Sequence, residues 1–132
     1  MTGAADVRWL VETSIMVDVL RGSESARSWV DSVPRGCRHI SVVTAAELYS
    51  GCRNRLEQRK VSRELVLYKT LWIDEAISMR ALSLYEGHHL SHGVGFLDCI
   101  ISATAELHAL SLATLNLKHF RALPGLVLTK PY

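Results

Sequence analysis

The chain has 132 residues, which is the size of one domain, and its net charge of +2 at pH 7 identifies no class of binding partner. Hydrophobic residues make up 48% of the chain and charged residues 21%, which excludes a disordered or fibrous protein. No apolar run is long enough to span a membrane, and the first residues lack the apolar stretch of a signal peptide. We therefore expect a single cytoplasmic domain over residues 1–132.

The first half of the chain alternates between apolar runs and segments with helical periodicity. In chain order, the pattern predicts a strand at 7–11, helices at 15–20 and 23–33, a strand at 39–43, and helices at 44–51 and 55–70. Thr44 is the expected N-cap of the helix that begins there, and Glu47 follows three residues later, as in a capping box.

The second half of the chain continues this alternation. In order, it predicts a strand at 71–73, a helix at 74–88, a loop at 89–95, a helix at 96–108, a strand at 111–115, a short helix at 117–120 and a last strand at 126–129. Strands that alternate with helices are typical of a three-layer α/β/α domain with a mostly parallel sheet, and this is the fold class that we expect.

Three acidic residues and one asparagine lie at junctions between the predicted strands and helices. Glu12 and Asn116 each follow a strand, while Glu47 and Asp98 each lie in the first turn of a helix. Because a parallel sheet brings its strand ends and helix starts to one edge, we expect these side chains to meet there. Carboxylates so gathered repel one another unless a cation lies between them, and oxygen ligands suit Mg²⁺, Mn²⁺ or Ca²⁺. The predicted metal ligands are Glu12, Glu47 and Asp98, with Asn116 assisting them.

Other interpretations of these residues stay open. Thr13 and Ser14 offer hydroxyls to a metal-bound water or a phosphate, but helix capping also explains them. Each acid taken alone could likewise be a helix cap. A domain that binds a small phosphorylated ligand is another alternative, although no glycine-rich phosphate loop follows the first strand.

A basic segment lies between residues 53 and 69, where six lysine or arginine residues accompany two glutamates. Such a segment beside an acidic site could hold a phosphate backbone while the site acts on it. The alternative is a solvated helix face on which glutamates pair with lysine and arginine.

Five short motifs stand in the order in which one known family has them. They are Leu-Val-Glu-Thr-Ser-Ile at 10–15, Ser-Val-Val-Thr-Ala-Ala-Glu-Leu at 41–48, Leu-Asp-Cys-Ile-Ile-Ser-Ala-Thr-Ala at 97–105, Ala-Thr-Leu-Asn-Leu-Lys-His-Phe at 113–120 and Pro-Gly-Leu at 124–126. On these motifs the chain resembles PIN-domain ribonucleases, especially the VapC-type toxins of toxin–antitoxin pairs, from about residue 8 to residue 128.

The resemblance implies a sheet of four or five parallel strands and a Mg²⁺- or Mn²⁺-dependent endoribonuclease. It also implies a protein that is usually a homodimer and that a small VapB-type antitoxin holds inactive. The family's acidic positions fall on Glu12, Glu47, Asp98 and the region of Asn116, and its members use a hydroxyl at Thr114 beside the metal ions. Contacts to RNA or to the antitoxin are expected from nearby basic residues, namely Arg21, Arg53, Arg55, Arg59 and Lys60.

Two positions depart from the usual pattern of this family. Glu12 stands where aspartate is ordinary, and its extra methylene could carry its oxygens past a metal ion. Asn116 and His119 stand where the last acid is usually found. Asparagine offers an uncharged oxygen, and His119 can support the site by a hydrogen bond to a phosphate or water but suits Mg²⁺ poorly. The alternative function is therefore a weakened or inactive PIN-fold protein that binds RNA or a partner protein without cutting.

Overall fold

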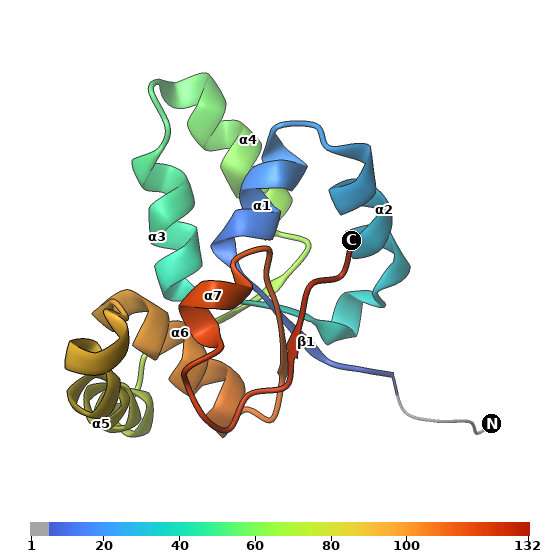
Figure 1. The fold of residues 1–132 in the computed structure, drawn as a ribbon. Helices are drawn as coiled ribbons and strands as arrows, with labels where there is room; N and C mark the ends of the chain where they lie inside the picture. Colours follow the sequence, from blue (N-terminus) through green and yellow to red (C-terminus); the bar gives the residue numbers. More distant parts are fainter. Residues whose placement is uncertain (1–5) are drawn as a thin grey trace.

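A sheet of five parallel strands lies at the centre of the fold (Figure 1). The structure is a computed structural model, and it describes residues 6–132. From one edge to the other, the strands are β3 (Lys69–Leu71), β2 (Arg38–Ser41), β1 (Trp9–Val11), β4 (Ser111–Ala113) and β5 (Leu128–Thr129).

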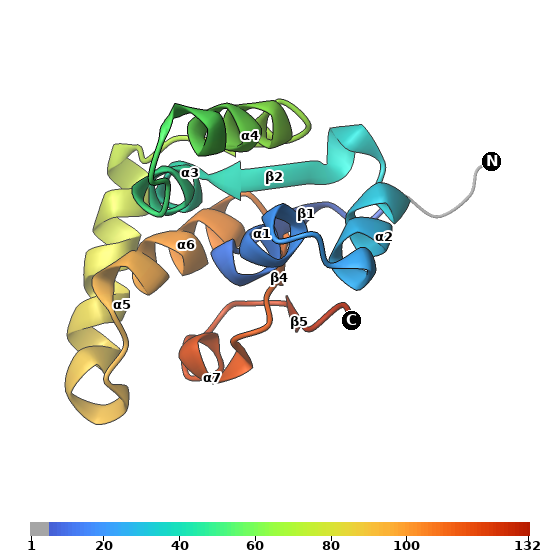
Figure 2. The same ribbon diagram turned by 90° about the horizontal axis from the view of Figure 1, so that it is seen from above.

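Helices cover both faces of this sheet (Figure 2). One group consists of α1 (Thr13–Leu20), α2 (Glu24–Ser32), α3 (Val42–Ser50) and α4 (Arg55–Leu65), and the other of α5 (Glu75–His92), α6 (Phe96–Leu107) and α7 (Leu117–Phe120). A single turn of 3-10 helix, Arg35–Cys37, leads into β2. The expected three-layer α/β/α domain is confirmed, with five strands in its sheet. Within residues 6–132, no helix combines the length and the apolar character that a membrane crossing needs.

The neighbouring strands β1 and β4 are largely apolar on both faces because alternate side chains enter different cores. Leu10 and Leu112 pack in a cluster with residues of α5 and α6, whereas Val11 and Ala113 pack in a cluster with residues of α1, α2 and α4. All four of these strand residues are at most 1% exposed. A parallel sheet covered on both sides requires such continuous apolar runs, and this is why the strands could be recognised in the sequence.

The second strand gives way to a helix earlier than predicted. β2 ends at Ser41 and α3 begins at Val42, so the last two residues of the predicted strand are helical. Ser41 Oγ accepts the Val43 N–H at 3.0 Å, and this cap overrides the strand preference of two adjacent valines. The prediction that Thr44 caps this helix is therefore wrong, and Glu47 lies in the second turn of α3 rather than the first.

Several other boundaries differ from the prediction: β1 begins two residues later, β4 ends two residues earlier and β5 begins two residues later than expected. α4 ends at Leu65 rather than at residue 70, and the next strand is Lys69–Leu71 rather than 71–73, because these residues pair in parallel with His39 to Ser41 of β2. α5 continues to His92 through residues predicted as a loop. It ends there because Gly93, at φ 62°, is the residue that adopts the left-handed conformation of a helix C-terminus.

The strand order makes β1 and β4 neighbours although they are far apart in the sequence. From β1 the chain adds β2 and β3 on one side, and it then returns through α5 and α6 to add β4 and β5 on the other. Open parallel sheets bind ligands at such a switch point, in the crevice at the carboxyl ends of the two central strands. Glu12 directly follows β1 and Thr114 directly follows β4, so both lie at this crevice.

Candidate active site

A pocket of about 460 Å³ opens at the switch point, and we call it the carboxylate pocket. Its walls come from α1, α3, α6 and the segment that follows β4. The residues that line it are Glu12, Thr13, Ser14, Val17, Asp18, Arg21, Glu47, Asp98, Leu115, Asn116 and His119. The structure therefore brings together all four residues predicted as catalytic, along with three of the four predicted to support them; the fourth, Thr114, contacts Glu12 directly.

Glu12 is only 6% exposed, and hydroxyl groups hold its carboxylate. Its Oε1 accepts hydrogen bonds from the Ser14 N–H at 3.2 Å, from Ser14 Oγ at 2.5 Å and from Thr114 Oγ1 at 2.6 Å. The first of these makes Glu12 the N-cap of α1. Oε2 accepts no hydrogen bond from residues 6–132, so this oxygen is available to a ligand in the carboxylate pocket.

The donor of each hydrogen bond in this network follows from counting protons. Ser14 Oγ accepts the Leu115 N–H at 3.0 Å, and Thr114 Oγ1 accepts the Asn116 N–H at 2.9 Å. Each hydroxyl has a single proton to donate, and Glu12 Oε1 is the nearest acceptor for both. The network therefore joins the ends of β1 and β4 and fixes where the Glu12 carboxylate lies.

A second chain of hydroxyls positions Glu47. Thr13 Oγ1 donates to Glu47 Oε1 at 2.7 Å and lies 2.9 Å from Thr44 Oγ1. Because Thr13 gives its proton to Glu47, Thr44 is the donor to Thr13. Thr44 is 1% exposed, so it contributes to the site through Thr13 from inside the protein and not as the helix cap expected from the sequence.

Asp98 lies in the first turn of α6, and its Oδ2 is 3.5 Å from His119 Nδ1. Burial raises the pKa of Asp98 above its ordinary value, His119 opposes that shift, and the charges of Glu12 and Glu47 raise the pKa further. The net direction is upward. The three carboxylates thus act on one another electrostatically, as expected of groups that share a pocket.

Asn116 and His119 border the pocket at α7. Asn116 is the N-cap of this short helix, but its side chain makes no capping hydrogen bond and is exposed. Its amide group is therefore available to a ligand. The ring of His119 is occupied on one side by its contact with Asp98.

A fourth carboxylate, Asp18, lines the pocket and was not among the predicted site residues. It lies one turn after Ser14 on α1, and its Oδ2 accepts a hydrogen bond from the Tyr132 hydroxyl at 2.9 Å. Helical spacing was the available signal, since the residues four and seven positions after Ser14 share its face of the helix. Those residues are Asp18 and Arg21, and both line the pocket.

The donor set fits a hard divalent cation that keeps part of its water shell. The pocket offers carboxylate, amide and hydroxyl oxygens, which suit Mg²⁺ and Mn²⁺. Among residues 6–132, however, no three histidine, cysteine, aspartate or glutamate side chains are arranged to hold one ion together. Mg²⁺ in proteins commonly uses one or two carboxylates and retains several waters, so the pocket matches that mode and not a closed cage. Joint binding of one ion by Glu12, Glu47 and Asp98 stays a prediction.

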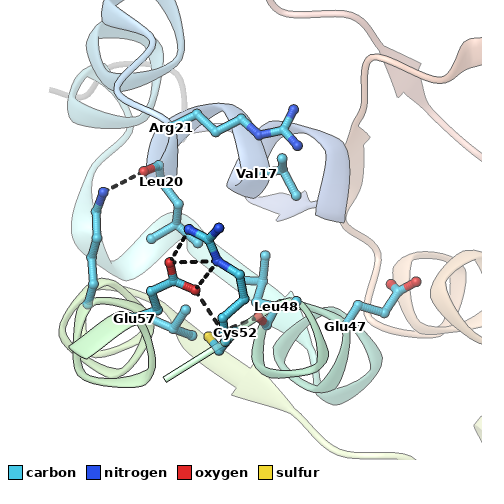
Figure 3. Close-up of a pocket in the computed structure, with 11 residues that line it drawn as sticks. Val17, Leu20, Arg21, Glu47, Leu48, Cys52 and Glu57 are labelled. Carbon is cyan, nitrogen blue, oxygen red and sulfur yellow. Dashed lines mark hydrogen bonds and ion pairs between the residues drawn. The ribbon is translucent and has the colours of Figure 1, made fainter. Parts of the chain in front are cut away.

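A second hollow, of about 390 Å³, lies between α1, α3 and α4 (Figure 3). We call it the helical hollow. It adjoins the carboxylate pocket, because Val17, Arg21 and Glu47 line both. Figure 3 shows the side chains of Arg21 and Glu47 pointing away from Glu57, which lies at the other end of the hollow. Aliphatic side chains form much of its wall, namely Val17, Leu20, Leu48 and Val61.

The predicted basic contacts are not equally available to a partner. Arg53 pairs with Glu57 at 2.7 Å, and Lys60 donates to the Leu20 carbonyl at 2.6 Å. Arg55 and Arg59 are exposed on α4 and do not line either pocket. Arg21 makes no ion pair with residues 6–132 and lines both, so it is the predicted basic residue best placed to meet a ligand at the site.

Known proteins resemble this chain in sequence and in fold. A family model described as "PIN domain" matches residues 9–126. Ribonuclease VapC10 from Mycobacterium tuberculosis is 39% identical over 113 residues, which cover 84% of each chain. Ribonuclease VapC1 from Rickettsia felis is 30% identical over 125 residues, which cover 89% of this chain and 91% of that one. A solved toxin–antitoxin complex from Klebsiella pneumoniae contains a chain with a TM-score of 0.78 and 28% identity, matching 93% of this chain and 97% of its own. The chain therefore belongs to the PIN-domain family.

Proposed function

We propose that this chain is a metal-dependent endoribonuclease toxin that hydrolyses RNA phosphodiester bonds and is neutralised by a cognate VapB-type antitoxin. The observation that carries this proposal is the meeting of Glu12, Glu47 and Asp98, from three separate elements, in one pocket at the switch point of the sheet. The names of the VapC10 and VapC1 ribonucleases support the activity, and the Klebsiella pneumoniae complex supports the antitoxin.

Some residues of the carboxylate pocket would bind the metal ion, and others would bind the RNA substrate. Glu12 Oε2, Glu47 and Asp98 would hold Mg²⁺ or Mn²⁺, which when bound lowers the pKa of a water and offsets phosphate charge. Because hydroxyls already fix Glu12 Oε1, this side chain needs little reorganisation when a ligand arrives. The Asn116 amide can donate to a phosphate oxygen, and Arg21 can pair with the RNA backbone.

The antitoxin is proposed to occupy the helical hollow. Its aliphatic wall suits the apolar face of a peptide segment, and its shared edge with the carboxylate pocket would let the occupant cover Glu47 and Arg21. One contact surface would then both hold the partner and close the site.

We also propose that the protein is cytoplasmic and forms a homodimer. Large apolar side chains are exposed along α5 and α6, among them Met79, Leu82, Leu90, Phe96 and Leu97. Such a surface is typical of a protein–protein interface. Light scattering from the purified protein would give twice the mass of one chain, and a mass of one chain would contradict the dimer.

A second candidate function is an RNA- or protein-binding module that does not cut. The absence among residues 6–132 of three side chains arranged around one ion favours it, as does glutamate at position 12. Cleavage by the purified protein separates the two.

Asp98→Asn is expected to abolish cleavage of structured RNA by purified, antitoxin-free protein in Mg²⁺ or Mn²⁺. Asparagine keeps the shape of the side chain but removes the negative charge that attracts the ion, so a loss of about 100-fold or more is expected. A gel-based cleavage assay measures it. Glu86→Gln is the matched control, because Glu86 is exposed on α5 and loses the same charge outside the site. Equal residual cleavage by wild type and Asp98→Asn would indicate a contaminating nuclease and would favour the binding module that does not cut.

Without metal, Asp98→Asn is expected to be more stable than wild type at pH 7. The raised pKa of Asp98 means that the folded protein holds this proton more tightly than the unfolded chain. The group therefore stabilises the fold below its ordinary pKa of 3.8, and this contribution is lost as the pH rises through the folded-state pKa. Urea denaturation at pH 7 and at low pH tests it: the advantage of the variant should vanish in acid.

In the presence of Mg²⁺ or Mn²⁺, the wild type is expected to become more stable than Asp98→Asn. An ion that binds only the folded wild type at 100 times its Kd adds about 2.7 kcal/mol to the free energy of unfolding. Asp98→Asn should gain much less. If neither ion changes the free energy of unfolding of the wild type, the metal site is contradicted, whatever the cleavage assay shows.

Glu12→Asp is expected to lower, not raise, both the ion-induced stabilisation and the cleavage rate. The side chain is one methylene shorter, so its contacts with the Ser14 and Thr114 hydroxyls should lengthen, and a buried hydroxyl left without its acceptor costs about 1–3 kcal/mol. Denaturation with and without Mn²⁺, and initial cleavage rates, measure the two effects. A faster variant would mean instead that the extra methylene of Glu12 misplaces its oxygens.

Leu20→Glu is expected to prevent co-purification with the antitoxin while RNA cleavage persists. Leu20 lines the helical hollow but not the carboxylate pocket, and a buried charge there opposes an apolar occupant. The candidate antitoxin for this test is to be sought as a small protein encoded by an upstream frame that overlaps this one. Val127→Glu, at a residue 65% exposed beside β5, is the control. Unchanged co-purification of Leu20→Glu would place the antitoxin elsewhere.

A further inference from the structure

A third hollow, of about 270 Å³, opens beside the carboxylate pocket and has no role in the function described above. We call it the lysine hollow. Its walls come from the end of α5, the start of α6 and α7, and its lining residues are His92, Gly93, Val94, Asp98, Lys118 and His119. It shares Asp98 and His119 with the carboxylate pocket, so a chain that occupies one can continue into the other.

The lysine hollow is much less acidic than the carboxylate pocket. Four carboxylates line the pocket, whereas one carboxylate, Asp98, lines the hollow together with Lys118 and two histidines. Lys118 is a full cation at neutral pH, is exposed, and makes no ion pair or hydrogen bond with residues 6–132. Asp98 is already faced by His119. The charge of Lys118 is therefore not cancelled inside the protein.

His92 adds a directed hydrogen-bonding group. Its Nδ1 lies 2.7 Å from Ser91 Oγ, and the serine hydroxyl can donate to it. In that arrangement the proton of the neutral imidazole is on Nε2, which has no hydrogen-bond partner among residues 6–132. A ring N–H and an ammonium group, neither of which has a hydrogen-bond partner among residues 6–132, thus line one small hollow.

Two of the predicted basic contacts, Arg53 and Lys60, already use their side chains within the protein. The charge of Arg53 is matched by Glu57, and Lys60 is bound to a backbone carbonyl. Either would have to give up an internal contact before it could bind RNA. Lys118 has no internal contact to give up before it binds a phosphate. The sequence alone does not show this difference.

We propose that the lysine hollow binds the RNA phosphate next to the one at the carboxylate pocket, with Lys118 as its ion-pair partner and His92 as a hydrogen-bond donor. This rests on the proposed ribonuclease function. RNA carries one negative charge per nucleotide, and the carboxylate pocket repels the phosphates that flank the scissile one. A cation just beyond Asp98 offsets that repulsion without competing for the metal ligands.

The test is RNA binding by Lys118→Met in a Glu47→Gln background, which removes a proposed metal ligand that does not line the lysine hollow. Fluorescence anisotropy with a short labelled single-stranded RNA gives Kd at several salt concentrations. Loss of one phosphate contact should weaken binding several-fold, about 5-fold at low salt, and reduce the slope of log K against log salt by about 0.7. Arg8→Met is the control, since Arg8 is exposed just before β1, at the amino edge of the sheet and outside the basic segment at 53–69.

A second measurement separates this proposal from the proposed function. In the protein with Glu47 intact, Lys118→Met should raise KM for RNA cleavage and leave kcat within about 2-fold, because Lys118 binds substrate outside the reacting centre. Cleavage with Kd, salt slope and KM all unchanged in Lys118→Met would overturn the lysine hollow and leave the ribonuclease standing. Weaker RNA binding by Lys118→Met in a protein that never cleaves would support the hollow although the ribonuclease fails. Weaker antitoxin binding with unchanged RNA binding would make it a protein contact and overturn the proposal.

Discussion

The hydrogen bond from Thr114 to Glu12 is the contact on which the rest of the site depends. It connects the residue after β1 with the residue after β4, and Ser14 adds two further donors from α1. A carboxylate as buried as Glu12 costs several kcal/mol unless polar groups replace its water. These donors supply that replacement on one oxygen only. The contacts that stabilise the switch point of the sheet therefore also leave Glu12 Oε2 to the pocket.

The three central carboxylates differ in how many polar contacts stabilise their negative charge. Glu12 receives three hydrogen bonds, Glu47 receives one and is exposed to water, and Asp98 is partly buried with only His119 beside it. The raised pKa of Asp98 records this imbalance, since burial and the neighbouring charges both disfavour its ionised form. Asp98 is thus the carboxylate that the proposed divalent cation would stabilise most.

The sheet and the three acids could be predicted because each depends on a local pattern. Apolar runs mark strands buried on both faces, and acids just after them fall at one edge of a parallel sheet. Contacts between residues far apart in the sequence are not signalled by any local pattern. The support of Glu47 by Thr44 needs α1 and α3 side by side, and the hydrogen bond from Tyr132 to Asp18 joins the two halves of the chain. The start of α3 was missed because the Ser41 hydroxyl outweighs the strand preference of the valines after it.

An acidic pocket that acts on a polyanion needs cations beside it rather than within it. The helical hollow meets the pocket through Arg21 and Glu47, and the lysine hollow meets it through Asp98 and His119, with no lining residue common to the two hollows. Arg21 and Lys118 therefore line two separate hollows beside the carboxylates, where each would hold a phosphate of the proposed RNA substrate. An antitoxin seated between α1, α3 and α4 would cover the side of Arg21 and leave that of Lys118 open. Inhibition would then follow from blocking one end of the RNA path together with Glu47, and it would not require the partner to fill the whole site.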